Sequence, residues 1–346
     1  MKILLLNNRY PSVKHPHIAT FIKSIFESLK NCGADVDLLI SSRNKLSGIP
    51  KTLDTTLYYL QLIFFTKYKL YELLYINRFN HFGFILATKI RKNHKVIIHW
   101  HGSELRDFNI LHQFSFIFIK KKYFHIVPSK YYKELLMYKL NINEEKIFIS
   151  PSGGVDFLLF CEKKEISYSE ESIILGFASG AKMEKGFDLV LQLIHDLDDI
   201  ERLTGKDILV RLIEYGAEKE TLNQIRTMSN ISLVIPMEKE KMPQFYNSCD
   251  ILLFPTHHES LGLVGIEAMA CNKPVIGSNC TALPEYIIPG KTGELFEKED
   301  YESFKKVVIK VINNIGDYSP REHIGNYSKD KVDDGYGKLL EIINKD

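Results

Sequence analysis

Residues 250–277 read DILLFPTHHESLGLVGIEAMACNKPVIG, and this stretch predicts one strand–loop–helix unit of a parallel α/β sheet. The apolar run that ends at Pro255 is typical of a strand buried on both faces. The apolar segment that follows Gly262 predicts a helix. Glu259 lies in the loop before the helix, and Glu267 lies in its second turn. Two carboxylates therefore flank the predicted helix start.

The same alternation runs along the whole chain. Apolar strand patterns lie at 2–6, 36–40, 73–76, 96–99, 126–127, 147–149, 173–177, 208–213, 233–235, 251–254 and 274–276. Helical patterns lie between them, at 18–29, 131–140 and 187–197. Alternating strands and helices predict doubly wound domains with parallel sheets.

A polar stretch near residue 165 breaks this rhythm, so we predict two domains. The first is an N-terminal Rossmann-like domain at 1–160. The second, at 161–326, is also Rossmann-like. A last helical pattern at 327–346 is expected to cross back and pack on the first domain. Ligands of such sheets bind outside the carboxyl ends of the strands, and the cleft between two domains is the default site.

Composition excludes several other classes of protein. The chain has 346 residues, of which 45% are hydrophobic and 25% charged, as in an average globular protein. This excludes a disordered, fibrous or disulfide-scaffold protein. No apolar run reaches the ~18 residues of a membrane-spanning helix, and the first strand is too short for a secretory signal. Five irregularly spaced cysteines fit neither a zinc site nor a disulfide framework. We expect a cytoplasmic protein with reduced thiols.

The charge is divided unevenly along the chain. Residues 1–150 hold 23 Lys and Arg against 10 Asp and Glu, whereas residues 151–346 hold 22 against 33. The basic half contains aromatic–basic segments at 64–69 and 118–124. These could contact the anionic inner face of a membrane; lysines that only solvate helix faces are the alternative. No nucleic-acid motif is found, so nucleic acid is not an expected partner.

A helix start such as the one after Gly262 binds phosphate, because its free N–H groups and partial positive charge face the anion. Carboxylates beside it can hold sugar hydroxyls. No Asp-x-Asp pair in a loop offers a metal site. The acidic pairs at 198–199 and 333–334 fall in helical patterns, where they are solvated.

Here the sequence resembles a family. Glu259 and Glu267 are separated by seven residues, after a strand that ends in Pro and at the start of a Glu-Ala-Met-Ala helix. They resemble the E-x7-E motif of retaining glycosyltransferases of the GT-B fold, family 4 (glycosyl transferases group 1). Further segments resemble family elements in the same order: HGSE at 101–104, VPS at 127–129, PSGGVD at 151–156, KG at 185–186, PE at 284–285 and GKTG at 290–293. The resemblance implies an α/β GT-B fold, with two doubly wound Rossmann-like domains that face each other across a cleft. It also implies that the domain at 1–160 binds the acceptor and that the domain at 161–326 binds the nucleotide-sugar.

The resemblance also implies residue roles. Groups at the donor diphosphate would be Lys185 and the backbone amides of Gly262, Leu263 and Val264. Glu267 would hold the nucleotide ribose, and Glu259 the transferred sugar. His101 would face that sugar from the opposite domain. We therefore predict His101, Glu259 and Lys185 as the catalytic residues. Arg9 and Arg106 are candidates for an anionic acceptor, with a surface role as the alternative.

The sequence departs from the family pattern at two loops. The loop after the first strand lacks the paired glycines of many members. Positions 179 and 180, where many members place an arginine before the Lys-Gly pair, are Ser179 and Gly180. Lys182 is a candidate replacement, although an ammonium lacks the bidentate fork of arginine.

The resemblance implies a retaining hexosyltransferase, and the predicted phosphate-binding groups make a metal unnecessary. It would move a sugar from a nucleotide-diphosphate sugar, which is a substrate and not a cofactor, to a glycan or lipid-linked acceptor. We expect it in surface polysaccharide biosynthesis, in the cytoplasm and peripheral on the inner membrane face. The residues do not specify the base, the sugar or the acceptor. A non-catalytic GT-B module that binds a glycan or a partner, and a sugar-nucleotide epimerase, are the alternatives.

Overall fold

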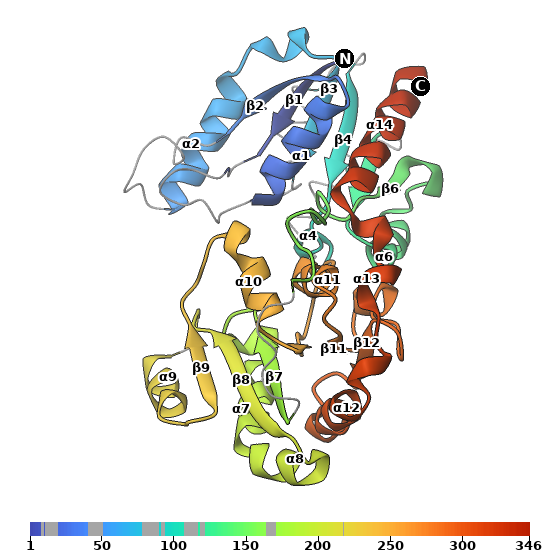
Figure 1. Cartoon of the computed structure of the whole chain (residues 1–346). Coiled ribbons are helices and arrows are strands. Elements are labelled where there is room, and N and C mark those ends of the chain that lie inside the picture. Colours follow the sequence, from blue (N-terminus) through green and yellow to red (C-terminus); the bar gives the residue numbers. More distant parts are fainter. Residues whose placement is uncertain are drawn as a thin grey trace. The chain divides into compact units, whose positions relative to one another are not determined.

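A computed structural model describes residues 1–7, 10, 20–40, 51–77, 90, 94–106, 117, 122–163, 171–216 and 218–346. The chain forms two compact units (Figure 1). The first comprises Met1–Gly154 and Lys329–Asp346, and the second Val155–Ser328. The division falls slightly before the predicted boundary at residue 160, because Phe160 packs in the core of the second unit.

The first unit contains a six-stranded parallel sheet in the order β2-β1-β3-β4-β5-β6. Its strands are β1 (Lys2–Leu6), β2 (Asp35–Leu39), β3 (Leu73–Asn77), β4 (Lys95–His99), β5 (Phe124–Val127) and β6 (Ile147–Ile149). The central strands are apolar because helices cover both of their faces. Ile3 and Leu5 point to one core, and Leu4 and Leu6 to the other.

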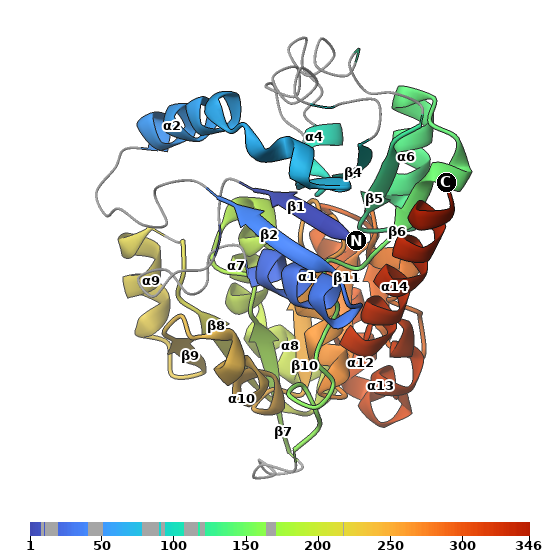
Figure 2. The same ribbon diagram turned by 90° about the horizontal axis from the view of Figure 1, so that it is seen from above.

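Helices lie on both faces of this sheet. The helices are α1 (Thr20–Asn31), α2 (Lys51–Phe64), α4 (Ser103–Arg106), α6 (Lys130–Leu140) and α14 (Lys329–Lys345). Figure 2 shows α1 and α2 on opposite sides of β1 and β2. The apolar stripe of α14 packs with α1 and the sheet; its residues are Val332, Tyr336, Leu339, Leu340 and Ile343. The last helix thereby completes the first unit.

The second unit contains another six-stranded parallel sheet, in the order β12-β11-β10-β7-β8-β9. Its strands are β7 (Ser172–Phe177), β8 (Asp207–Ile213), β9 (Ile231–Val234), β10 (Ile251–Phe254), β11 (Val275–Ser278) and β12 (Gly293–Phe296). The sequence patterns missed β12, a short edge strand with the polar Glu294 inside it. The two parallel, helix-covered sheets confirm the predicted doubly wound α/β class.

Two cores cover the faces of this sheet. One core contains residues of α7 (Phe187–His195), α8 (Leu197–Thr204), α9 (Lys219–Arg226) and α12 (Tyr301–Asn313). The other contains residues of α10 (Met242–Asn247) and α11 (Leu263–Ala270), on which α13 (Pro320–His323) also packs. Because α7 and α11 each follow a central strand, their N-termini lie at the carboxyl edge of the sheet.

The two units carry opposite net charges. The first holds 27 Lys and Arg against 15 Asp and Glu, and the second holds 18 against 28. On α2, Leu60, Ile63 and Phe64 are exposed side chains at helical spacing, and Phe64 reaches 75% exposure. In the described part of the chain, no helix combines the length and the apolar character that crossing a bilayer requires.

Candidate functional site

The loops after β7 and β10 lie where the strand order of the second sheet reverses. The two strands are neighbours, with Leu175 opposite Ile251. From β7 the chain continues to β8 and β9 on one side, and from β10 to β11 and β12 on the other. The two loops therefore diverge, and such a switch point is where open α/β sheets bind ligands.

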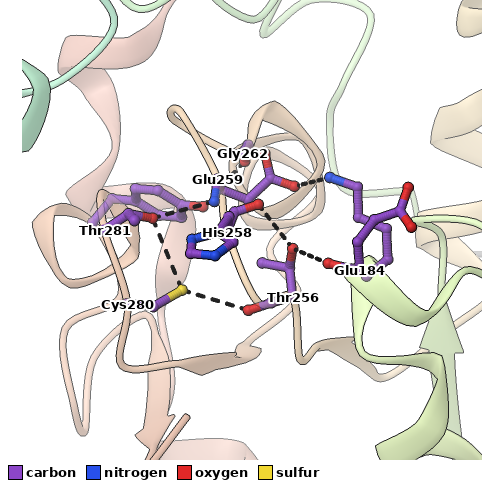
Figure 3. A network of polar contacts seen from close by, with 9 residues as sticks. Glu184, Thr256, His258, Glu259, Gly262, Cys280 and Thr281 are labelled. Carbon is purple, nitrogen blue, oxygen red and sulfur yellow. Dashed lines mark hydrogen bonds and ion pairs between the residues drawn. The ribbon is translucent and has the colours of Figure 1, made fainter. Parts of the chain in front are cut away.

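An ion pair joins the two loops. The Lys185 Nζ contacts the Glu259 Oε1, although the residues are 74 positions apart. Lys185 ends a 3₁₀ turn (Met183–Lys185) after β7, and in Figure 3 the Glu259 carboxylate points across to the loop that carries Glu184. The side chains are 29% and 15% exposed, so water screens this pair less than a surface pair.

A glycine allows the loops to approach closely. Gly186 has a φ of 74°, in the left-handed region that favours glycine. A Cβ at this position would lie 1.9 Å from the carbonyl oxygen of Pro255. The Lys-Gly pair is thus explained locally: Lys185 supplies the cation, and Gly186 leaves room for the loop after β10.

Further hydrogen bonds fix the Glu259 loop (Figure 3). The Thr256 hydroxyl donates to the His258 carbonyl at 3.1 Å, and the Cys280 thiol donates to the Thr256 carbonyl at 3.4 Å. The Glu259 N–H donates to the Thr281 Oγ1 at 3.2 Å. Loops after two neighbouring strands thereby hold Glu259, which makes its position suitable for a functional carboxylate.

The helix after this loop begins without a side-chain cap. Gly262 precedes α11 with a φ of 86°, and a Cβ there would meet the Tyr286 hydroxyl at 2.7 Å and the Phe254 ring at 2.8 Å. The predicted amides of Gly262, Leu263 and Val264 therefore lie at a bare helix start beside Glu259. Such a start offers N–H groups and a partial positive charge to an anion.

Glu267 lies farther along α11 and is 8% exposed. It accepts a hydrogen bond from the Tyr246 hydroxyl of α10 at 2.9 Å. Burial raises the pKa of Glu267, while the charge of Lys239 and the bond from Tyr246 oppose this shift. The structure therefore places Glu267 beside α10, one turn from the helix start, in surroundings where its charge costs free energy.

Lys182 lies at the other end of the turn that carries Lys185. Its Nζ lies 5.0 Å from the centroid of the Tyr215 ring, in the loop after β8. Among the described residues, no group of three or more His, Cys, Asp or Glu side chains is arranged to hold a metal ion. Lys182 and Lys185 are two cationic side chains at this switch point.

His101 follows β4 at the carboxyl edge of the first sheet. Its Nε2 lies 2.9 Å from the Asn77 Oδ1, and the Asn77 Nδ2 donates to the Asn7 Oδ1 at 3.0 Å. The ring of His101 stacks on that of His99, with centroids 4.5 Å apart. Burial, and next to it the charge of His101, lowers the pKa of His99 well below its usual value. His101 therefore stacks on a neutral ring.

The two candidates for an anionic acceptor are Arg106 and Arg9. Arg106 ends the short helix α4, where its side chain is exposed. Arg9 lies outside the described residues. The sequence analysis missed Asn77, Tyr246 and Thr281. Asn77 ends a strand at the carboxyl edge, which is a usable signal, whereas Tyr246 and Thr281 reach the site only through tertiary packing.

The comparisons with known proteins agree with this architecture. Residues 161–331 match the family model described as Glycosyl transferases group 1. An uncharacterized glycosyltransferase of Methanocaldococcus jannaschii is 29% identical over 234 residues, which cover 67% of this chain and 62% of that protein. The capsular polysaccharide biosynthesis glycosyltransferase CapM of Staphylococcus aureus is 29% identical over 202 residues, which cover 55% of this chain and 50% of CapM. The chain thus spans about half to two thirds of the length of these relatives.

A solved structure shares the fold along the whole chain. The sucrose-phosphate synthase of Thermosynechococcus elongatus superposes with a TM-score of 0.77 and 15% identity, covering 99% of both chains. At this identity the likeness shows the fold alone. With the two six-stranded parallel sheets, it confirms the two-domain α/β GT-B fold.

Proposed function

We propose that this GT-B chain, whose residues 161–331 match the group 1 glycosyl transferases, is a glycosyltransferase that uses a nucleotide-diphosphate sugar. The observation that carries the proposal is the Lys185–Glu259 contact at the switch point, beside the bare start of α11. A cation, free helix amides and a carboxylate meet there on three adjacent segments. A diphosphate and the sugar attached to it require these same groups.

The chemistry of sugar transfer explains why these groups would accelerate it. When the glycosidic bond breaks, negative charge accumulates on the leaving diphosphate. Lys185 and the amides of Leu263 and Val264 would stabilise this charge more strongly in the transition state than in the bound donor. We propose that Glu259 hydrogen-bonds hydroxyls of the transferred sugar, and that the reaction proceeds with retention and without a metal.

Glu267 is proposed to hold the ribose of the donor. A buried carboxylate that accepts one hydrogen bond from Tyr246 keeps acceptor capacity for ligand hydroxyls. Those hydroxyls would offset part of the cost of burying the charge. His101, held by Asn77, is proposed to face the transferred sugar.

For the acceptor, we propose a glycan or a lipid-linked intermediate of surface polysaccharide assembly, at the cytoplasmic face of a membrane. The basic first unit supports this. The exposed side chains of Leu60, Ile63 and Phe64 on α2 lie next in sequence to the exposed Lys67 and Lys69. Apolar side chains flanked by lysines suit an anionic bilayer surface.

Flotation with vesicles tests this membrane contact. Phosphatidylcholine vesicles with and without phosphatidylglycerol are used at low and high salt. The protein is expected to float only with anionic vesicles at low salt, and Phe64→Glu is expected to abolish flotation. Tyr138→Glu, at an 88% exposed position on α6, is the matched control and should still float. Equal flotation of both variants would contradict α2 as the contact.

A panel of nucleotides tests the function itself. UDP, GDP, ADP, dTDP and their sugars are each screened by thermal shift, since a ligand at 100 times its Kd adds about 2.7 kcal/mol of stability. The nucleotides of one base are expected to stabilise the protein. Incubation of the matching nucleotide-sugar with glycan and lipid-linked acceptors should then release the nucleoside diphosphate and yield a product with the anomeric configuration of the donor. An inverted product would contradict retention.

Gly180 favours a second candidate, a non-catalytic GT-B module that binds a glycan or a partner. Many members of the resembled family place an arginine near this position, and the loss of a diphosphate contact is one route to a decayed site. Such a module should bind no nucleoside diphosphate. The same panel therefore separates the two candidates, and the Lys185–Glu259 contact favours the enzyme.

A further inference from the structure

The loop after β8 packs against the loop after β7. The Ala181 N–H donates to the Tyr215 carbonyl oxygen at 2.7 Å, which fixes the two backbones together. The Lys182 Nζ then lies over the Tyr215 ring, 5.0 Å from its centroid. Tyr215 is 57% exposed, so its ring is not part of the apolar core. The ring instead contacts the ammonium group of Lys182.

Two glycines shape this contact. Gly180 has a φ of 80°, and a Cβ there would lie 2.9 Å from the Tyr215 carbonyl oxygen. Gly216 has a φ of 91°, and a Cβ there would lie 2.6 Å from the Lys182 Cγ. An arginine at 180 would clash and be strained, so the loop excludes it. The stem of Lys182 instead fills the space that Gly216 leaves.

We propose that Tyr215 is a positioning residue that holds Lys182 as the second cation of the diphosphate site, in place of an arginine that position 180 cannot accommodate. The inference rests on the proposed function and identifies the groups that select its donor. An aromatic face attracts an ammonium. It also restrains a flexible side chain before the ligand arrives, which lowers the entropic cost of binding.

The position of Lys182 suits this role. The Lys185 N–H donates to the Lys182 carbonyl at 2.9 Å, so the two lysines delimit one turn. Lys185 contacts the loop after β10, and Lys182 contacts the loop after β8. Because β7 lies between β10 and β8, the two lysines contact loops on opposite sides of its carboxyl end. We expect a diphosphate, which carries charge on two phosphorus centres, to engage both lysines.

The test compares the affinities of a nucleoside and of its diphosphate, for the base that the panel selects, by ligand-observed NMR and calorimetry. Lys182→Ala should lower the affinity for the diphosphate by about tenfold and leave the affinity for the nucleoside unchanged. Tyr215→Leu should lower only the affinity for the diphosphate, by about fivefold. Tyr215→Phe keeps the ring, so it should bind the diphosphate as the wild type does. Lys291→Ala, at an exposed lysine of the same unit, is the control.

The double variant Lys182→Ala/Tyr215→Leu should lose no more affinity than Lys182→Ala alone, because Tyr215 acts through Lys182. Additive losses, or no effect of Lys182→Ala, would overturn the proposal. Equal weakening of nucleoside and diphosphate by Tyr215→Leu would also overturn it, since the ring would then contact the base. If the wild type binds no nucleoside diphosphate, the proposed function fails as well, before any variant is compared.

Discussion

Lys185 and Glu259 form an ion pair across the switch point of the second sheet, between segments that are 74 residues apart. The pairing neutralises the cation when no anionic ligand competes for it. We expect a diphosphate to take over Lys185 and to leave Glu259 to the sugar. The contact thus links the two halves of the proposed donor, its leaving group and its transferred group.

Removing either partner should have different consequences. Lys185→Ala is expected to weaken binding of the nucleoside diphosphate and to lower kcat by a factor of about 10²–10³, because a charge-stabilising donor is lost. Glu259→Ala frees the ammonium, so diphosphate affinity should be kept or improved while turnover falls. Calorimetry and initial rates measure both effects. Glu297→Ala, at an exposed carboxylate of the same unit, serves as the control. Weaker diphosphate binding by Glu259→Ala would contradict the assignment.

Gly186→Ala should destabilise the second unit by about 2–4 kcal/mol. The new Cβ would overlap the Pro255 carbonyl, and the alanine would have to keep a left-handed φ. Gly205→Ala is the matched control. Gly205 has a φ of 65° but no atom within 4 Å of a Cβ, so only the backbone term of about 1 kcal/mol remains. Urea unfolding measures both. Equal costs would mean that the close approach of the loops is unimportant.

Glu267→Gln should make stability less dependent on pH. Burial raises the pKa of Glu267 above its ordinary 4.5, so the folded state holds the proton more tightly than the unfolded chain. The free energy of unfolding of the wild type therefore falls as pH rises from 4.5 through the raised value. Glutamine does not titrate, so the variant does not lose stability in this way. The free energy of unfolding of the variant relative to the wild type should therefore rise across this pH window and then level off. Unfolding curves at several pH values check this, and parallel curves would contradict it.

The same Glu267→Gln variant should bind nucleoside diphosphate more weakly, because a neutral amide is a poorer acceptor for ribose hydroxyls than a carboxylate. Calorimetry at constant pH measures the change. The opposed effects on stability and binding distinguish a ligand-binding carboxylate from a structural one. Unchanged affinity would leave Glu267 without its proposed role.

Asn77→Ala should lower kcat/KM by about ten- to hundredfold, because the His101 ring loses the group that fixes it. The Asn77 Oδ1 can only accept, so the His101 Nε2 donates to it. Asn77→Asp keeps this acceptor, so its loss of kcat/KM should be smaller than that of Asn77→Ala. Equal losses in the two variants would contradict a role for the His101 hydrogen bond.

Periodicity alone predicted much of the fold, because strands buried on both faces are continuous apolar runs. The pattern over 187–197 predicted a single helix, whereas the structure ends α7 at His195 and starts α8 at Leu197. Asp196, between them, accepts hydrogen bonds from Tyr301 at 2.8 Å and from Lys305 at 2.9 Å. Both donors lie on α12, so a tertiary contact accompanies a break that local spacing did not reveal.

The sequence by itself determined the alternation of strands and helices, the glutamates on either side of a helix start, and the lysine beside Gly186. These features follow from local spacing and from the conformations that single residues allow. Only the tertiary structure decided that Lys185 pairs with Glu259, that Tyr246 donates a hydrogen bond to Glu267, and that the Tyr215 ring contacts Lys182. Each such contact joins loops or helices that the sheet order brings together, and sheet order is set by packing over the whole unit.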